Sequence, residues 1–396
     1  MQRFGLALAL ALACAACNPT TLKQGFCRGD SDCSGSRCNM TTWRCMPTDG
    51  GTDGDARDGG DARDTAPEVP FNCHTANDMC PADAGVCNPD GGMCVECLMN
   101  DHCSSRNANT PICAAQMCRA CATDDECPDP KVCLPDGHCA TPGDVIFVEQ
   151  ATGCSADAGT TSMPYCTLAD GVGHLDSGHT VLVARGPLNG PLAVNGGTGK
   201  VFVVGKQGGA GPAKIGAGVG TTAITVSGGD VSIRDLEVFS GGSAASKGIV
   251  VKGSTTALTL SNVKVDLGMG LGIQADNASL LTMDRCTVAS NDQGGIRLDG
   301  TQFHIKNTKV TNNGPGDDNG TGWGGLRITN VVNGGTHSLE LMTVTNNTNV
   351  GISCSAAVMS SGVLVSDNTG GLQVTGSCSI MPCSLDAGTT TCGAQF

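Results

Sequence analysis

The chain of 396 residues is poor in aromatic side chains and in basic charge, and it has no long apolar segment after its first 16 residues. It holds eight Phe, two Trp and one Tyr, and its formal net charge is −14. An acidic chain lacks the basic surface that nucleic-acid-binding proteins present, so we expect no nucleic-acid partner. The absence of a later apolar run excludes an ordinary membrane-spanning helix, which needs about 20 apolar residues.

Two residue types are instead abundant, with 58 Gly and 25 Cys. Glycine inside a helix costs about 1 kcal/mol relative to alanine, so this composition argues against a helical protein and favours short strands joined by tight turns. Cysteine at this density is typical of exported proteins that fold in an oxidising compartment.

The N-terminal stretch MQRFGLALALALACAA has one Arg, an apolar run and small residues at its end, as export signals do. The cysteine that follows these small residues, Cys17, makes the stretch 1–17 resemble a bacterial lipoprotein signal, and Cys14 is the other candidate. The resemblance implies that Cys17 is lipidated and that its acyl chains bind the membrane. We therefore expect an outer-membrane or cell-surface lipoprotein, with a freely secreted protein as the alternative.

A cysteine-rich module is expected at 18–46, followed by an acidic Asp/Gly linker at 47–70. Residues 49–64 include six Asp and have almost nothing to bury, so we expect a disordered tether without a specific calcium site. Three further cysteine-rich repeats fill 71–140. The four groups of cysteines are Cys27, Cys33, Cys38 and Cys45; Cys73, Cys80, Cys87 and Cys94; Cys97, Cys103, Cys113 and Cys118; and Cys121, Cys127, Cys133 and Cys139.

Four cysteines in each small repeat predict two disulfides, with three possible connectivities. The spacing of Cys94, Cys97, Cys118 and Cys121 also approaches that of a zinc ribbon. Because Cys103 lies between these pairs and an export signal precedes them, we favour disulfides over zinc. The segments VECLMNDHC (95–103) and RACATDDEC (119–127) resemble the short repeats of myxobacterial surface lipoproteins, which implies an extracellular spacer or recognition module.

A glycine followed by an aliphatic residue recurs every 20–30 residues, a period typical of solenoids with one strand pattern per unit. The pairs begin at Gly248, Gly272, Gly295, Gly325, Gly351 and Gly371. Two further short strands follow each pair, and an Asn recurs at one corner, as at Asn291 and Asn313, where side-chain amides can stack into a ladder. We predict an all-β parallel β-helix over 141–396. An antiparallel β-sandwich is the alternative.

The start of this region, with a strand from Asp144, a loop that a Cys154–Cys166 disulfide could close, and a helical turn at 169–175, resembles the opening of right-handed β-helix proteins of the pectate-lyase-like type. The resemblance implies a right-handed β-helix with a capped first coil. At the other end, Cys354, Cys378, Cys383 and Cys392 predict two disulfides that close the last coils. Cys286 is then left alone, as a buried apolar residue.

Aligning the coils predicts which side chains point outward from the Gly-aliphatic strands. Arg297 and Arg327 are expected to be stacked neighbours, and the longest interval places an inserted loop beside them. The candidate wall for a glycan consists of Arg297, Arg327, Asp276, Asp299, Asp317, Asp318 and Trp323. Arginines can pair with uronate carboxylates, Trp323 could stack on a sugar, and the acids could hold Ca²⁺. The alternative is that these charges only pair laterally and keep the sheet soluble.

The motifs of β-helix enzymes are largely missing. Asp317-Asp318 resembles the paired aspartates of polygalacturonases, but no Asn-Thr-Asp or Gly-His-Gly segment is present and Arg327-Ile-Thr lacks the expected lysine. The seven His are scattered and form no Ser-His-Asp set or metal-binding pair. We therefore expect no catalytic residue and no required cofactor. The predicted role is structural display or binding of a polysaccharide or another surface protein, and a uronan lyase or hydrolase is the alternative.

Overall fold

The computed structural model describes residues 36–39, 44–47, 73, 80, 85–90, 92–107, 109–175, 180–197, 199–316, 322–332, 335–370, 373–380, 384–386 and 389–391. The chain divides into two compact units, Met1–Glu68 and Val69–Phe396, and each is described by itself. In the first unit, strands β1 (Ser36–Asn39) and β2 (Arg44–Pro47) pair antiparallel. The predicted lipidation site Cys17, the cysteines Cys27 and Cys33, and the linker from residue 48 lie outside the described residues.

The three cysteine-rich repeats share one disulfide pattern, in which the first cysteine bonds the third and the second bonds the fourth. The six bonds are Cys73–Cys87, Cys80–Cys94, Cys97–Cys113, Cys103–Cys118, Cys121–Cys133 and Cys127–Cys139. This resolves the connectivity that the sequence left open. It also uses all four cysteines that have zinc-ribbon spacing, so the disulfide prediction is confirmed and these thiols are not available to a metal.

Short elements carry these disulfides. In the first two repeats the third and fourth cysteines lie opposite each other on a hairpin, and in the third repeat Cys133 and Cys139 form an isolated bridge. The elements are β3 (Val86–Cys87), β4 (Cys94–Val95), α1 (Asn100–Ser104), β5 (Ile112–Ala114), β6 (Met117–Arg119), the 3₁₀ turn η2 (Asp124–Glu126) and, after the third repeat, η3 (Pro142–Asp144).

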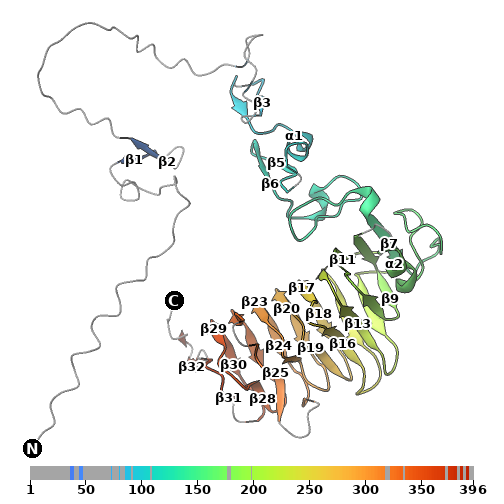
Figure 1. Ribbon diagram of the computed structural model, residues 1–396, viewed down its shortest axis with the longest axis vertical. Helices are drawn as coiled ribbons and strands as arrows, with labels where there is room; N and C mark the ends of the chain where they lie inside the picture. Colours follow the sequence, from blue (N-terminus) through green and yellow to red (C-terminus); the bar gives the residue numbers. More distant parts are fainter. Residues whose placement is uncertain are drawn as a thin grey trace, which may run out of the picture. The chain divides into compact units, whose positions relative to one another are not determined.

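The rest of the second unit is a parallel β-helix, in which successive coils stack on one another (Figure 1). Each coil contributes one strand to each of three sheets, in the order sheet 1, sheet 2, sheet 3. All pairings within these three sheets are parallel, so the alternative of an antiparallel sandwich is excluded.

Sheet 1 has nine strands: β7 (Val145–Glu149), β8 (Val181–Arg185), β11 (Lys200–Lys206), β14 (Asp230–Arg234), β17 (Ala257–Ser261), β20 (Leu280–Asp284), β23 (Phe303–Lys306), β26 (Ser338–Glu340) and β29 (Met359–Ser361). Sheet 2 has eight strands: β9 (Pro187–Asn189), β12 (Lys214–Ala217), β15 (Glu237–Ser240), β18 (Lys264–Asp266), β21 (Thr287–Ala289), β24 (Lys309–Thr311), β27 (Thr343–Thr345) and β30 (Leu364–Ser366).

Sheet 3 has eight strands, and the Gly-aliphatic pairs belong to it. The strands are β10 (Leu192–Val194), β13 (Thr222–Ser227), β16 (Lys247–Lys252), β19 (Leu271–Asp276), β22 (Ile296–Asp299), β25 (Trp323–Thr329), β28 (Val350–Cys354) and β31 (Val374–Gly376). The aliphatic residues Ile249, Ile273, Ile296, Leu326 and Ile352 form one continuous column, as predicted. All five are fully buried in the core. A last pair of strands, β32 (Ser384–Asp386) and β33 (Thr389–Thr391), is antiparallel.

The predicted asparagine ladder runs along the corner between sheets 2 and 3. The amide of Asn291 donates to the side-chain oxygen of Asn313 at 2.9 Å, Asn313 donates to Asn347, and Asn347 donates to Asn368, each also at 2.9 Å. These amides are at most 5% exposed. The residue before each ladder position has a positive φ of 54–57°, which turns the next side chain inward: Ser290, Asn312, Asn346 and Asp367.

The repeated glycines are required by this ladder. A Cβ at Gly351 would lie 2.5 Å from the Asn368 amide nitrogen, and one at Gly295 would lie 2.9 Å from that of Asn313. At Gly325 a Cβ would also lie 2.3 Å from the carbonyl oxygen of Gly351 in the next coil. The glycine column and the asparagine ladder therefore form a single close-packed contact between neighbouring coils.

The last coil departs from the predicted register. Val374, and not Leu372, continues the aliphatic column, and Thr375 follows Ser353 in the outward column where Gln373 was expected. The side-chain oxygen of Gln373 instead accepts the Asn368 amide at 2.7 Å and the Asn368 backbone N–H at 3.1 Å. Gln373 thus ends the ladder, because its longer side chain reaches the acceptor position that an asparagine of a further coil would occupy.

The first coil is capped by α2 (Leu168–Leu175), as predicted. Leu168 and Leu175 join the main core, and the Cys154–Cys166 disulfide closes the preceding loop. At the other end, Cys354 bonds Cys378, while Cys383 and Cys392 lie outside the described residues. Cys286 is a buried free thiol, and its burial raises its pKa to about 11, which agrees with a role as an apolar core residue.

The third cysteine-rich repeat packs on the outer face of the first strands of sheet 1. Val132 and Ala140 of the repeat region are buried against the outward side chains of the first three strands: Val145, Phe147, Val181, Val183, Phe202 and Val204. Strands with apolar residues on both faces must be covered on both faces, since each buried apolar side chain contributes about 1.5–3 kcal/mol. The repeat supplies that second cover, so the boundary expected between residues 140 and 141 crosses a shared core.

We predict that Asn347→Ala will lower the free energy of unfolding by about 2–4 kcal/mol, because it removes the acceptor that the Asn313 backbone N–H and side-chain amide share and the donor to the Val310 carbonyl in the interior. Chemical denaturation of the purified chain measures the change. Gln302→Ala is the matched control, since Gln302 makes only 3.3 Å contacts with Thr336 and its loss should cost less than about 0.5 kcal/mol. Equal losses of unfolding free energy in the two variants would show that the asparagine ladder does not stabilise the fold.

Candidate functional site

The predicted wall of sheet 3 has the expected register. Arg297 pairs with Gln274 on one side and with Arg327 on the other, and Asp276 pairs with Asp299. The outward column is therefore confirmed up to Ser353 of β28, and the two arginines are direct neighbours. Asp317 and Asp318 lie outside the described residues.

The charges of this wall bond laterally to one another. Arg297 lies 3.4 Å from the Asp276 carboxylate, which also accepts the Gln274 amide, and Lys247 donates to the side-chain oxygen of Gln274. Asp299 accepts the amide of Asn330 at 2.7 Å. The polar atoms of Asp276 and Gln274 are thus already engaged within the sheet, which favours the alternative of lateral pairing over an open binding wall.

Trp323 does not form the predicted stacking platform, because its side chain is fully buried. The indole packs closely against two glycines: a Cβ at Gly316 would lie 2.0 Å from the ring, and one at Gly294 would lie 2.8 Å from it. The register of β25 shifts between Trp323 and Leu326, and the Gly316 N–H at the start of the inserted segment donates to the Trp323 carbonyl at 2.6 Å. Trp323 is therefore a buried anchor for Gly316. The many glycines around it could have suggested this, since they leave space for a large ring.

A second polar surface lies on sheet 1, beside the third cysteine-rich repeat. The cleft there has a volume of about 450 Å³. It is lined by Cys121, Ala122, Cys133, Leu134 and Pro135 of the repeat, and by Arg234, Asp235, Thr259, Ser261, Asn262, Thr282, Asp284, Arg285 and Lys306 of the β-helix. Its two walls thus differ in chemistry: the repeat gives mainly apolar surface and a disulfide, and the β-helix gives hydroxyls and charges.

Alternation of side chains along β17 and β20 determines which residues form the floor of the cleft. Thr259 and Thr282 are paired neighbours on β17 and β20 and point outward between buried leucines and methionines. No described residue makes a hydrogen bond with either hydroxyl, so both can bond to a ligand. Arg285, with φ of 54°, lies at the corner after β20, which holds its side chain at the edge of the floor.

The most exposed charged side chains of the cleft are cations. The Asp235 carboxylate accepts the Asn262 amide at 2.7 Å, and Asp284 accepts the Asn307 amide at 2.8 Å, so both acids are held by the protein. The Arg285 side chain is 68% exposed, with a 3.5 Å contact to Asp284. Lys306 is exposed as well, and within the described part of the chain no carboxylate lies within ion-pair distance of it. An anion entering the cleft would meet these two cations.

A polar latch holds the two walls together. One carboxylate oxygen of Asp124 in the repeat lies 2.5 Å from the Arg234 guanidinium, and the other lies 3.2 Å from the Lys206 ammonium. Arg234 also donates to the Cys133 carbonyl at 2.5 Å. All three charged side chains are less than a quarter exposed, so this contact is better shielded than an ordinary surface ion pair.

Sequence reasoning missed this cleft because its two walls come from segments more than 100 residues apart. Coil alignment assigns outward columns within the β-helix but says nothing of what packs on them. One signal was present: strands 145–149, 181–185 and 200–206 have apolar residues at successive positions, which indicates burial on both faces. That pattern could have indicated a covering segment on sheet 1.

The comparisons with known proteins agree with the coil architecture. Residues 218–384 match the family model described as a right handed beta helix region, so the β-helix is right-handed, as predicted. No curated protein matches the chain. Among solved structures, a pectate lyase, Pel9A, shows 14% identity and a TM-score of 0.38, over 63% of this chain and 81% of its own. A likeness of that size carries no argument about substrate or mechanism.

We predict that Asp124→Ala will release the third repeat from sheet 1, because Arg234 and Lys206 lose the carboxylate between them. The expected loss is about 2 kcal/mol, below the 3–5 kcal/mol of fully buried pairs because the site is partly exposed. Denaturant unfolding measures it, and increased binding of an apolar dye reports exposure of the face around Phe147 and Phe202. Asp125→Ala, one residue further on and exposed, is the control. An equal response in both variants would show that the latch contributes nothing.

Proposed function

We propose that this protein is an exported, lipid-anchored cell-surface protein that binds an acidic polysaccharide in the cleft between its third cysteine-rich repeat and sheet 1. The β-helix serves as the rigid scaffold, and the repeats and the acidic linker separate it from the membrane. Binding, and not cleavage, is the proposed activity. The observation that carries the ligand class is the pair of accessible cations, Arg285 and Lys306, beside unbonded threonine hydroxyls on a chain whose net charge is −14.

The proposed location is supported by disulfide chemistry. The described residues include eight disulfides, and the small repeats have little other core to hold them. Such bonds persist in oxidising compartments and are rare in the cytosol. In the described part of the chain, no helix has the length and apolarity that crossing a membrane requires. The proposed anchor is the acylated Cys17, whose chains would contribute about 0.8 kcal/mol per buried CH₂.

The proposed ligand fits the two walls of the cleft. Arginine and lysine pair with carboxylate or sulfate groups, and a guanidinium can do so in bidentate geometry. The free hydroxyls of Thr259 and Thr282 can exchange hydrogen bonds with sugar hydroxyls, while Leu134 and Pro135 offer an apolar surface to the C–H face of a ring. Adjacent coils repeat at about 4.8 Å, so an extended chain could lie across several coils.

We expect the full chain to bind an acidic glycan, such as polygalacturonate or alginate, more tightly than a neutral glucan. Arg285→Ala combined with Lys306→Ala should weaken binding about tenfold or more, because about 0.5–1 kcal/mol is lost for each charge contact and the hydrogen bonds are lost with it. Affinity electrophoresis and calorimetry, with and without Ca²⁺, measure the change. Shortening of the glycan would instead indicate the alternative lyase or hydrolase activity.

The matched control is Arg297→Ala with Arg327→Ala, which removes the same amount of charge from the wall of sheet 3. Binding should stay within about twofold of the unaltered chain, because Arg297 is already paired with Asp276. Loss of binding in this control and retention in the Arg285/Lys306 variant would move the site back to the wall predicted from the sequence. Equal binding to acidic and neutral glycans would refute the ligand class.

We expect metabolic labelling with palmitate to mark the protein in a bacterial host, and Cys17→Ser to abolish the label and release the protein from the membrane fraction. Cys14→Ser is the control and should retain the label. Labelling that persists in Cys17→Ser and disappears in Cys14→Ser would assign the anchor to the other cysteine. A protein that is unlabelled and soluble in all three forms would support free secretion.

A further inference from the structure

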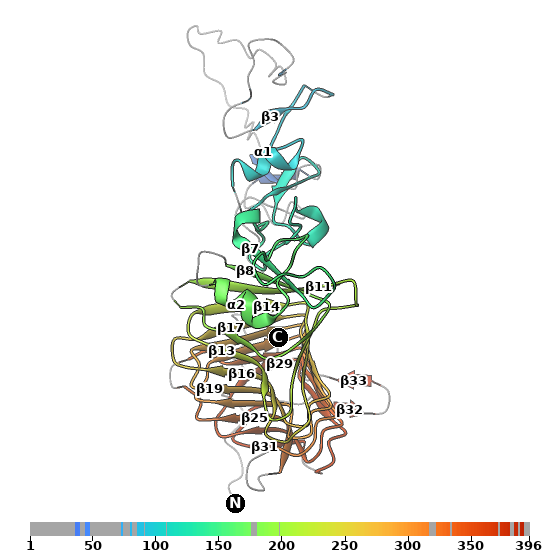
Figure 2. The ribbon, with the colours of Figure 1, turned by 90° about the vertical axis from the view of Figure 1, so that its right-hand side faces the viewer.

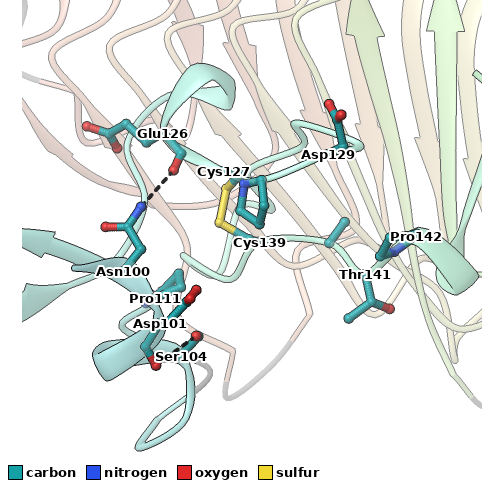
Figure 3. A pocket seen from close by; sticks show the side chains of 12 residues that line it. Asn100, Asp101, Ser104, Pro111, Glu126, Cys127, Asp129, Cys139, Thr141 and Pro142 are labelled. Carbon is teal, nitrogen blue, oxygen red and sulfur yellow. Dashed lines mark hydrogen bonds between the residues drawn. A yellow bond between two sulfur atoms is a disulfide. The ribbon is translucent and has the colours of Figure 1, made fainter.

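The second and third cysteine-rich repeats enclose a pocket that the proposed glycan site does not use. Its volume is about 550 Å³, within the range of about 300–1,000 Å³ typical of ligand sites. It is lined by Asn100, Asp101, Ser104 and Pro111 of the second repeat, by Glu126, Cys127, Pro128, Asp129 and Cys139 of the third, and by Ala140, Thr141 and Pro142. Figure 3 shows the Cys127–Cys139 disulfide between the second-repeat residues on one side and Asp129, Thr141 and Pro142 on the other.

The walls of this pocket are fixed by covalent and polar links. The Asn100 amide donates to the Glu126 carbonyl at 3.4 Å, and the Asn100 side-chain oxygen accepts the Cys113 backbone N–H at 2.9 Å. Arg119, in the short junction between the repeats, lies 2.5 Å from the Glu126 carboxylate. Both repeats also hold two disulfides each. The pocket is therefore formed before any ligand arrives, which lowers the entropic cost of binding.

Its surface combines an apolar floor with acidic groups. Three prolines, Ala140 and the disulfide supply the apolar part. The three carboxylates differ in their availability. Glu126 is engaged by Arg119, whose hydrogen bond lowers the pKa of that carboxyl to about 2, so its charge is permanent but balanced. Asp101 and Asp129 are exposed, and within the described residues no side chain or N–H bonds to either carboxylate.

We propose that this pocket binds a lysine side chain of an extended segment of a partner polypeptide. A lysine has the matching chemistry, because its four-carbon stem can lie on proline and disulfide surface while its ammonium reaches the carboxylate of Asp101 or that of Asp129. The volume is larger than one side chain needs, so neighbouring residues of the segment fit beside it. A free amine would leave much of the apolar floor uncovered.

Charge complementarity selects this occupant over an acidic or neutral one. The exposed charges of the pocket, on Asp101 and Asp129, are negative, whereas the exposed charges of the cleft on sheet 1, on Arg285 and Lys306, are positive. The two sites therefore take ligands of opposite charge, and one can fail without the other. In this arrangement the repeats act as a second recognition surface, and a glycan and a basic polypeptide can be bound by the same chain.

The test uses the full chain and two peptides in saturation-transfer NMR: acetyl-Gly-Ala-Lys-Ala-Gly-amide and the same peptide with norleucine in place of lysine. The lysine peptide should bind at least about fivefold more tightly at low salt, and the difference should shrink as salt screens the charges. Asp101→Asn with Asp129→Asn should reduce the affinity for the lysine peptide about fivefold to tenfold. Mass measurement of the oxidised chain verifies that the disulfides are intact.

Two further variants keep the proposal falsifiable. Asp125→Asn removes one charge from the same repeat at a residue outside the pocket lining, and it should change affinity by less than about twofold. Ser104→Trp adds an apolar ring at the pocket without changing charge, and it should abolish binding by filling the space. Equal binding of the norleucine peptide, full binding by Ser104→Trp, or an equal loss in Asp125→Asn would overturn the proposal, as would the absence of binding by the unaltered chain.

Discussion

The β-helix depends on one contact between neighbouring coils, in which a buried asparagine amide lies against a glycine backbone. The amides of Asn291, Asn313 and Asn347 each donate both to the next asparagine and to a strand carbonyl, so most of the polar groups buried at this corner are bonded, the side-chain oxygen of Asn291 at the start of the ladder being the exception. The amide can come this close only because Gly295, Gly325 and Gly351 carry no Cβ. A parallel sheet of short strands acquires in this way a fixed register. The columns of outward side chains, and with them every surface discussed above, inherit that register.

Because the register is fixed, the outward side chains of sheets 1 and 3 can be compared coil by coil. The two sheets differ in which of these side chains have no bonding partner within the described part of the protein. On sheet 3, the acid of each coil is met by an amide or a guanidinium of the same coil or the next, as at Asp276. On sheet 1, beside the third repeat, the acids are also held and Arg285 contacts Asp284 and Ser261, but among the described residues nothing bonds the Lys306 ammonium or the two threonine hydroxyls of the cleft (Figure 2 shows sheet 1 and the repeats from a second side). A binding surface is recognised by what it leaves unsatisfied, and by that measure sheet 1 is the better candidate.

The sequence alone predicts the regular part of this architecture because periodicity is visible in one dimension. The Gly-aliphatic strands, the asparagine corner, the Cys154–Cys166 bond and the isolation of Cys286 follow from spacing or residue type, and the capping segment follows from the resemblance to pectate-lyase-like β-helices. The irregular parts needed three dimensions. Periodicity does not show that Trp323 points inward. The glycines near it in the sequence, such as Gly316, are a hint, but Gly294 becomes its neighbour only in the folded chain. Likewise Gln373 leaves the outward column because its side chain is long enough to accept the Asn368 amide at the end of the ladder, and its position in the repeat does not show this.

The contact between the third repeat and the first strands of sheet 1 has a consequence for the order of folding. Residues 121–139 precede β8 and β11 in the chain, and they cover the outward faces of both. In a chain that enters an oxidising compartment N-terminus first, the cover and its four cysteines enter before the strands that need it. The first coil then has a solid surface on which to form, and later coils can add to it one by one. The cysteine-rich repeat next to the β-helix would in this way guide the folding of the first coil as well as cover its outer face.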